Sequence, residues 1–241
     1  QKIKSCFVKK YYSDQVDEQE LLKSKGKLFL NSNRIDAINQ AQREGYEVAI
    51  LDDGLQDSLI NFDLSFICFN NLNWIGNGLT IPAGPLRESI NILVKYNHVF
   101  LNGNLENIEV IKKYILKINS KINIHIGKYL PSNLEEFNYE DKYLVFSGIG
   151  NHKTFVSMVK NYGLNVIKDI EFPDHYNYTD SDIDKILKQS DVINAKIITT
   201  EKDYYRLKNK KIDNIKIIKS ELKIIDEEKL FKIIMKKHET N

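Results

Sequence analysis

The chain has 241 residues, of which 42% are hydrophobic and 28% are charged, a composition typical of a folded protein with a core. Its 35 basic residues nearly balance 33 acidic ones, so the net charge of +2 gives the chain no general attraction for nucleic acid. The two cysteines, Cys6 and Cys68, fit neither a disulfide framework nor a zinc site, and a reducing compartment is expected. No apolar run approaches the ~20 residues of a membrane span, and no signal peptide is expected within these residues.

Short apolar segments alternate with helical patterns along almost the whole chain. The first, KIKSCFVKKYY, could be an interior strand, and because the sequence starts with Gln1 rather than Met we expect a missing N-terminal portion. Later strands are expected at residues 27–31, 47–53, 64–69, 98–102, 143–148, 165–172, 196–200 and 214–219, and a short apolar segment lies at residues 122–127. Helices are expected at residues 32–45, 105–118, 151–162, 179–189 and 226–237. This alternation predicts an α/β protein with parallel sheets covered on both faces.

The looser polar stretch KYLPSNLEEFNYEDK is the best candidate for a linker. We therefore expect a first α/β domain over residues 1–121, a linker over residues 122–141 and a second α/β domain over residues 142–241.

Polar clusters follow four of the expected strands, at the ends where open parallel sheets bind ligands. The clusters are the Asp52–Asp53 pair, SGIGN (147–151), FPDH (172–175) and TTEKD (199–203). Four clusters at equivalent strand ends favour an enzyme.

The Asp52–Asp53 pair has two interpretations. Asp-Asp-Gly is good turn chemistry, with Gly54 free to take a positive φ. The two carboxylates could instead hold a cation, usually magnesium, at the carboxyl end of a strand.

Other candidate residues also have a structural alternative. His175 is either structural or a proton-transfer group with a carboxylate partner. Asp17 and Glu18 suit the first turn of a helix, where the helix dipole favours acids. Arg87 ends a loop rich in glycine and proline that could cap a sheet or present the guanidinium to a phosphate.

Three further segments leave alternatives open. SGIGN is either a tight strand-to-helix turn or an anion-binding helix start. TTEKD could open a helix capped by Thr200, with Asp203 at the third position. The final basic helix could pack on a sheet or contact a membrane surface.

A P-loop is absent from these residues. No G-x-x-x-x-G-K-[ST] occurs, because neither Gly-Lys pair, at Gly26 and Gly127, has a glycine five positions earlier. A complete P-loop nucleotide triphosphatase cannot be inferred from this sequence.

Taken in order, VDEQELL, NR, LDDGLQ, GNGLTIPAGPLRE, FSGIGN, FPDHYNYT and TTEKDYYRL resemble the tetraacyldisaccharide 4'-kinase family of lipid A biosynthesis. The resemblance runs from about residue 16 to about residue 207. It implies transfer of the γ-phosphate of ATP, with Mg²⁺, to the 4'-hydroxyl of a lipid disaccharide 1-phosphate at the cytoplasmic face of the bacterial inner membrane. It also implies a P-loop-NTPase-like parallel-sheet core, incomplete here at its N-terminus, joined by a short β linker to a smaller α/β domain.

The resemblance also implies roles for single residues. By position, Asp17 and His175 correspond to a catalytic acid–histidine pair. Glu18, Asp52 and Asp53 take metal-associated places, and the substrate or phosphate region comprises Arg34, Gln56 and Arg87. The implied partners are the lipid disaccharide and, peripherally, the membrane surface, without nucleic acid.

Two departures from the family pattern keep alternatives open. Asp57 stands where the family usually has histidine, and the family's P-loop and membrane-associated helix should precede Gln1. A non-catalytic relative that binds a glycolipid or a partner is therefore an alternative, as is a kinase with a soluble nucleoside or sugar as acceptor.

Overall fold

The structure is a computed structural model that describes residues 3–13, 15–103, 107–207 and 214–240, apart from the side chain of Asp17. Helices and strands alternate along the chain, and all but one of the strand pairings between its described strands are parallel. The α/β class with parallel sheets is therefore confirmed. Within the described residues, no helix is both long enough and apolar enough to cross a membrane.

The chain forms two compact units, each built from several chain segments. Unit 1 comprises Gln1–Asn61, Glu135–His152 and Gly163–Lys219, and unit 2 comprises Phe62–Leu134, Lys153–Tyr162 and Ser220–Asn241. The domain boundaries expected from the sequence, with a linker at residues 122–141, stay a prediction.

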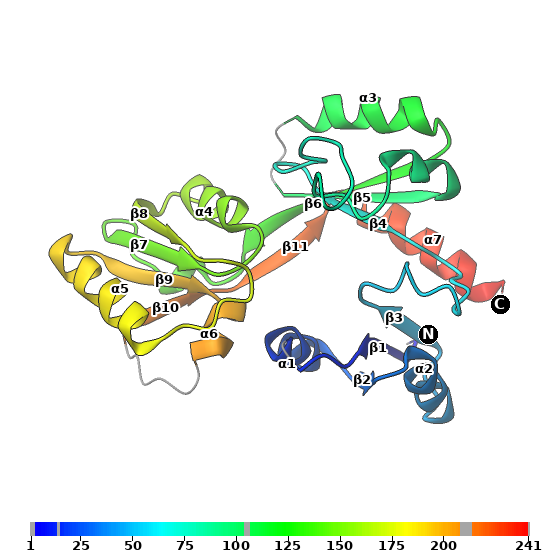
Figure 1. Cartoon of the computed structure of the whole chain (residues 1–241), viewed down its shortest axis with the longest axis horizontal. Coiled ribbons are helices and arrows are strands. Elements are labelled where there is room, and N and C mark those ends of the chain that lie inside the picture. The colour runs from blue at the N-terminus through cyan, green and yellow to red at the C-terminus, as the bar shows by residue number, and fades with distance from the viewer. Residues whose placement is uncertain (1–2, 14, 104–106, 208–213, 241) are drawn as a thin grey trace. The chain divides into compact units, whose positions relative to one another are not determined.

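The first sheet of unit 1 is parallel and has the strand order β2-β1-β3 (Figure 1). Its elements are β1 (Ser5–Lys10), α1 (Val16–Lys25), β2 (Leu28–Asn31), α2 (Arg34–Arg43) and β3 (Val48–Leu51). Cys6, Val8 and Phe29 form a small core with two alanines of α2. Because Val8 pairs with Leu51, the residues that follow β1 and β3 lie at the same edge of the sheet.

The second sheet of unit 1 is also parallel and has the order β10-β9-β7-β8. Its elements are β7 (Lys142–Ser147), β8 (Asn165–Glu171), α5 (Asp180–Val192), β9 (Lys196–Thr200), α6 (Glu201–Leu207) and β10 (Ile215–Ile218). Thr179 and Asp182 form a reciprocal capping box at the start of α5, as TDSD predicts. The helix α4 (His152–Asn161) follows β7 in the chain.

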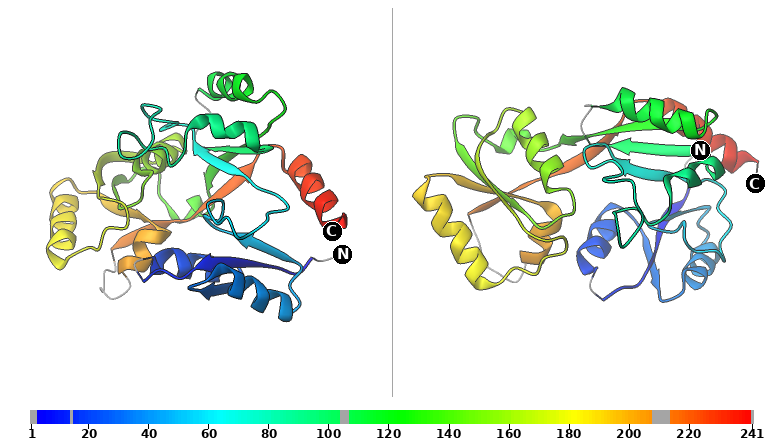
Figure 2. Two further views of the ribbon diagram at one scale, coloured as in Figure 1. Left: turned by 45° about the vertical axis from the view of Figure 1, so that its right-hand side comes forward. Right: turned by 45° about the horizontal axis from the view of Figure 1, so that its top comes forward.

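Unit 2 contains a sheet of order β11-β6-β5-β4, in which β11 alone is antiparallel to its neighbour. Its elements are β4 (Ile67–Asn70), the short helix η1 (Ile90–Lys95), β5 (His98–Asn102), α3 (Ile108–Ile118), β6 (Asn123–Pro131), β11 (Ser220–Ile224) and α7 (Glu227–Glu239), and a second short helix, η2 (Leu134–Glu136), follows β6. The short strand β11 pairs with the longer β6, and the two can be followed side by side in Figure 2. The sequence did not predict β11, a short strand in which four of the five residues of SELKI are exposed.

Candidate active site

Lys9 is the centre of an ionic cluster at the carboxyl end of β1. Its ammonium lies 2.7 Å from Oε2 of Glu18, in the first turn of α1, and 2.6 Å from Oδ2 of Asp52, directly after β3. The lysine side chain is only 4% exposed. A buried ammonium needs paired, hydrogen-bonded partners, and these two carboxylates supply them.

The charges in this cluster shift each other's pKa. Burial alone would lower the pKa of Lys9, but the hydrogen bonds and charges of Asp52 and Glu18 outweigh it and raise that pKa. Burial would likewise raise the pKa of Glu18, but Lys9 and Lys202 hold it at about 2. Glu18 is therefore an ionised carboxylate at neutral pH and a weak base.

Glu18 also connects the cluster to the second sheet of unit 1. Its Oε1 lies 3.1 Å from Nζ of Lys202, on α6, and 3.7 Å from Nε2 of His175. The first turn of α1 therefore lies beside His175, although about 160 residues separate them in sequence. Asp17 precedes Glu18 in this turn, but its side chain lies outside what the structure describes, so its pairing with His175 stays a prediction.

His175 is held in an uncommon conformation by its neighbours. Its φ is 56°, in the left-handed region, and its backbone N–H donates to the carbonyl of Gly148 and to Oδ1 of Asp174. On its imidazole, Nδ1 lies 3.4 Å from NH2 of Arg206. The ring is therefore held between α6 and the start of α1.

A buried carboxylate, that of Asp203 on α6, organises the turn after β7. It accepts hydrogen bonds from the N–H of Gly148, the hydroxyls of Tyr178 and Thr200, and the guanidinium of Arg206. Burial, followed by the charge of Asp203, raises the pKa of Tyr178. Because the amide of Gly148 is bonded to Asp203, the tight-turn interpretation of SGIGN is favoured over a free anion cradle. Thr200 accepts from the amide of Asp203, as expected for a helix cap.

The Asp52–Asp53 turn differs from the expected one in one respect. In the turn interpretation Gly54 is free to take a positive φ, but Asp53 takes it, with φ 54°. Arg34, the first residue of α2, donates from NH2 to the carbonyl of Asp53 at 3.0 Å, and its NH1 lies 3.6 Å from Oδ2 of Asp57. The hydrogen bond to its carbonyl helps to hold Asp53 in this conformation.

Arg34 is the least exposed of the three candidate phosphate-binding residues. Its side chain is 11% exposed, and its Nε is buried without a hydrogen-bond partner among the described residues. Asp57, the residue that departs from the family pattern, provides its carboxylate partner. Gln56 is exposed in the same turn, which is closed by a hydrogen bond from the amide of Asp57 to the carbonyl of Gly54.

Arg87 lies in unit 2 and is exposed at the end of the loop GNGLTIPAGPLRE. The loop is closed on itself, since the side chain of Asn77 bonds the amide of Leu79 and the carbonyl of Ala83. A Cβ on Gly84 would lie 2.3 Å from the carbonyl oxygen of Leu79, so only glycine fits there. These contacts are compatible with a loop that caps the sheet, and phosphate binding by Arg87 stays a prediction.

Sequence reasoning missed Lys9, Lys202 and Arg206. Lys9 lies in an expected strand, and a lysine in a strand is usually exposed to solvent. The signal that could have found it is its position at the carboxyl end of an expected strand, the kind of end at which the acidic pair Asp52–Asp53 also stands. Lys202 and Arg206 lie within TTEKDYYRL, a segment from which only a helix cap at Thr200 and Asp203 was predicted.

The described residues contain no group of three or more histidine, cysteine, aspartate and glutamate side chains arranged to hold a metal ion. The carboxylates of Glu18 and Asp52 each use one oxygen on Lys9. Asp52 is nevertheless half exposed, and magnesium commonly binds through one or two carboxylates together with waters and phosphates. The donor set therefore fits magnesium better than an ion that needs an all-protein cage.

Comparison with known proteins places the chain in a family. The family model described as tetraacyldisaccharide-1-P 4'-kinase matches residues 9–239. Tetraacyldisaccharide 4'-kinase of Pelagibacter ubique (strain HTCC1062) is 56% identical over 239 residues, which are 99% of this chain and 76% of that protein. The enzyme of the same name from Rickettsia felis is 34% identical over 226 residues, 92% of this chain and 66% of its own.

A solved structure supports the fold. The crystal structure of LpxK from Aquifex aeolicus in complex with ATP matches with a TM-score of 0.65 at 22% identity, over 98% of this chain and 79% of that one. At this identity the likeness is one of fold. The match of the family model over almost the whole chain carries the assignment: the chain belongs to the tetraacyldisaccharide-1-P 4'-kinase family.

Proposed function

We propose that this protein transfers the γ-phosphate of ATP to the 4'-hydroxyl of a tetraacyldisaccharide 1-phosphate, a step of lipid A biosynthesis. The observation that carries this proposal is the 56% identity to a tetraacyldisaccharide 4'-kinase over nearly the whole chain. The gathering of Glu18, Asp52 and His175, from three separate motifs, around Lys9 and Lys202 supports it. A non-catalytic binder would need no such cluster of charged groups at a strand end.

The proposed catalytic pair is Asp17 and His175. A sugar hydroxyl is a poor nucleophile, and a base that takes its proton promotes attack on phosphorus. A carboxylate with an ordinary pKa near 4 is a weak base alone, so a histidine beside it would act with it as one unit. The contact of His175 with Glu18, the neighbour of Asp17, supports this pairing.

Magnesium would be held by Asp52 and Asp53, with Glu18 nearby. When bound, the ion neutralises charge on the transferred phosphate. The protein's own cations have a related role, because Lys9 and Lys202 balance the negative charge of Glu18 and so limit repulsion of a polyphosphate. Arg34, Gln56 and Arg87 are proposed to bind the disaccharide phosphate, and the planar guanidinium groups suit bidentate phosphate recognition.

Radiolabelled transfer from ATP to tetraacyldisaccharide 1-phosphate tests the proposal, with protein made from the complete reading frame. Asp17→Ala and His175→Ala are each expected to lower kcat on the order of 100-fold, with the double variant little worse than the poorer single one. Absence of transfer, together with specific binding of the lipid, would instead support the non-catalytic alternative. Transfer to a soluble sugar or nucleoside only would support the third.

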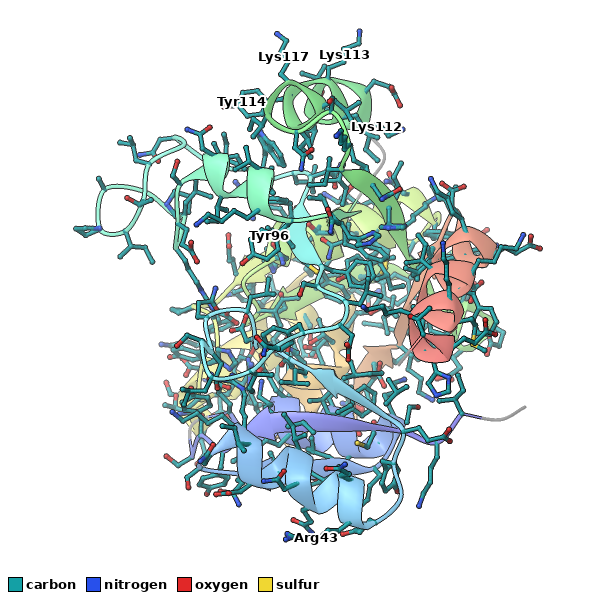
Figure 3. All side chains as sticks on the ribbon, turned by 90° about the vertical axis from the view of Figure 1, so that its right-hand side faces the viewer. Arg43, Tyr96, Lys112, Lys113, Tyr114 and Lys117 are labelled. Atoms are coloured by element: carbon teal, nitrogen blue, oxygen red, sulfur yellow. The ribbon has the colours of Figure 1, made fainter. Side chains whose placement is uncertain are left out.

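We also propose peripheral contact with an anionic membrane surface, at the cytoplasmic face, through helix α3 of unit 2. Its inner side buries Ile108, Ile111 and Ile115. Its outer side exposes the apolar residues Val110 and Leu116, and Figure 3 shows Lys113 and Lys117 pointing outward from the helix. Apolar side chains flanked by lysines suit the interface of an anionic bilayer.

Sedimentation with vesicles tests this contact. The protein is expected to sediment with phosphatidylglycerol vesicles and less with phosphatidylcholine vesicles. The double change Lys113→Glu with Lys117→Glu should reduce sedimentation several-fold. The same charge reversal at Lys153 and Lys160, exposed on α4, is the matched control. Equal loss in both doubles would show a general charge effect and remove the role of α3.

A further inference from the structure

We infer that Arg206 is a positioning residue that holds the imidazole of His175 in a single tautomer, with the proton on Nε2. The inference rests on the proposed kinase function for its role in catalysis, but its structural content stands on the contacts of Arg206. No motif-based assignment gave this residue a role.

The donor chemistry of arginine decides the tautomer. NH2 of Arg206 lies 3.4 Å from Nδ1 of His175, within hydrogen-bonding range. A guanidinium has only donors, so Nδ1 must be the acceptor, and the proton of the neutral ring lies on Nε2. Nε2 is the nitrogen that faces Oε1 of Glu18, at 3.7 Å, and this oxygen can only accept. Both sides of the ring therefore favour the same tautomer.

Arg206 is fixed well enough to impose this choice. Its side chain is 7% exposed, and its NH1 donates to Oδ1 of Asp203 and to the carbonyl of Gly148. Asp203 is itself fully buried and bonded to three further donors. The guanidinium cannot rotate away from His175 without leaving a buried carboxylate short of a partner, which is costly.

The same arginine also acts on the backbone of His175. The carbonyl of Gly148 accepts from both Arg206 and the amide of His175, so one oxygen links the two residues. The left-handed φ of His175 is an uncommon conformation that persists only when its surroundings impose it. Arg206 therefore helps to fix both the tautomer of the imidazole and the backbone conformation of His175.

For the reaction, the result is a ring whose N–H points to the acidic first turn of α1. Arg206 itself does not touch the reacting atoms in this account. It acts through His175, and its removal should lower kcat much more than it changes the KM for ATP.

Nitrogen chemical shifts of isotope-labelled histidine test the tautomer directly. The chain has five histidines, and His175→Gln assigns the signal. The signal of the neutral wild-type ring is expected at the limit for Nε2–H. Arg206→Ala should move the two nitrogen shifts toward each other and lower kcat at least about tenfold. Arg206→Lys keeps a donor but cannot span both acceptors, and should be intermediate.

Tyr178→Phe is the matched control, since it removes a different donor to Asp203 and leaves the guanidinium in place. It is expected to keep the wild-type tautomer and most of the activity. A wild-type proton on Nδ1, or a mixed tautomer, would overturn the inference even if Arg206→Ala fails to fold. An unchanged spectrum in a folded Arg206→Ala variant would overturn it too. Absent kinase activity with the Nε2–H tautomer intact would count against the proposed function alone.

Discussion

Asp53 and His175 share a backbone conformation that few residues other than glycine adopt. Their φ values are 54° and 56°, and left-handed backbone costs an ordinary residue about 1 kcal/mol or more. The two residues belong to different motifs, Asp53 to LDDGLQ and His175 to FPDH. Such strain persists where surrounding contacts impose it, and here the contacts come from Arg34 at Asp53 and from Gly148 at His175.

The conformation of Asp53 makes Asp53→Asn a clean test of the metal role. Asparagine tolerates the left-handed region as well as aspartate does, so the turn should keep its shape. Turnover by the complete protein should fall at least about 100-fold, while the midpoint of urea unfolding stays nearly unchanged. Steady-state kinetics and unfolding curves measure the two effects. Activity within about threefold of wild type would show that DDG serves only as a turn.

Asp57 is expected to weaken the hold of Arg34 on a phosphate. Its carboxylate pairs with Arg34 and would repel an incoming anion. Asp57→Asn keeps an oxygen to accept from the amide of Leu59 and removes the charge. We expect the KM for the lipid disaccharide to fall about two- to fivefold, with kcat unchanged, which corresponds to less than 1 kcal/mol.

Asp36→Asn provides the comparison for that change. Asp36 is an exposed acid in the first turn of α2, the helix that carries Arg34, so its substitution removes an equal charge near Arg34 without touching the Arg34–Asp57 pair. An equal fall in KM for both variants would mean that net charge, rather than the pairing with Arg34, sets the affinity.

For single residues, the sequence identified which side chains belong to the site better than it identified the partners of those side chains. The acids and His175 stood in recognisable motifs, and the structure brings Glu18, Asp52 and His175 together around Lys9 and Lys202. Their partners came from distant segments: Lys9 from a strand that precedes the motifs, and Arg206 from the end of another motif. A pairing between residues far apart in sequence depends on tertiary packing, which no local pattern encodes.

Among the elements, β5 and β6 carry a buried histidine pair that the proposed reaction does not use. Nδ1 of His98 lies 3.1 Å from Nε2 of His125, and the rings stack beside Phe66 and Phe100. Nδ1 of His125 is buried without a partner among the described residues. Burial lowers the pKa of both histidines, and the positive charge of Lys229 on α7 lowers both further.

Unit 2 should therefore lose stability in mild acid. In the unfolded chain both histidines take up protons near pH 6.5, whereas in the fold they resist protonation until the pH is lower. Their contribution is thus fully present above about pH 6.5 and is lost progressively as the pH falls below it. The urea midpoint, followed by a probe in unit 2, is expected to fall between about pH 7.5 and pH 5.

The double variant His98→Leu with His125→Leu should show a smaller fall over the same pH range, since neither residue can then bind a proton. His238→Gln, on α7, should behave as the wild type does. A double variant with the full acid sensitivity of the wild type would mean that other groups cause it.

Element boundaries were predicted where a local signal exists. The capping box marks the start of α5, and Asn33, a residue type that favours helix N-caps, caps α2 by accepting from the amide of Ile35. β11 had no such signal, because its residues are exposed and are held by pairing with β6. β6 likewise continues beyond the apolar segment 122–127 to Pro131, for as long as β11 pairs with it.

For the whole molecule, alternating strands and helices were enough to predict parallel sheets, but not how the segments combine into units. Unit 1 joins the N-terminal segment to residues 135–152 and 163–219, and the chain then enters unit 2 at β11. Segments far apart in the chain join one unit because their apolar surfaces pack against each other. Composition varies only along the chain and carries no information on such interleaving, and the linker expected at residues 122–141 stays a prediction.

The 241 residues are expected to bind ATP only weakly. The 241 residues contain no G-x-x-x-x-G-K-[ST], so they lack the backbone amides and the lysine that usually hold the β- and γ-phosphates. The charges gathered around Lys9 can pair with a phosphate only weakly, because Lys9 is already shared between two carboxylates. Calorimetric titration with magnesium-ATP is therefore expected to give a Kd weaker than about 1 mM for these residues alone. Protein from the complete reading frame, titrated in parallel, should bind more tightly if that frame supplies a P-loop. Micromolar affinity in the 241 residues themselves would show that the Lys9 cluster and Arg34 are enough to bind the nucleotide.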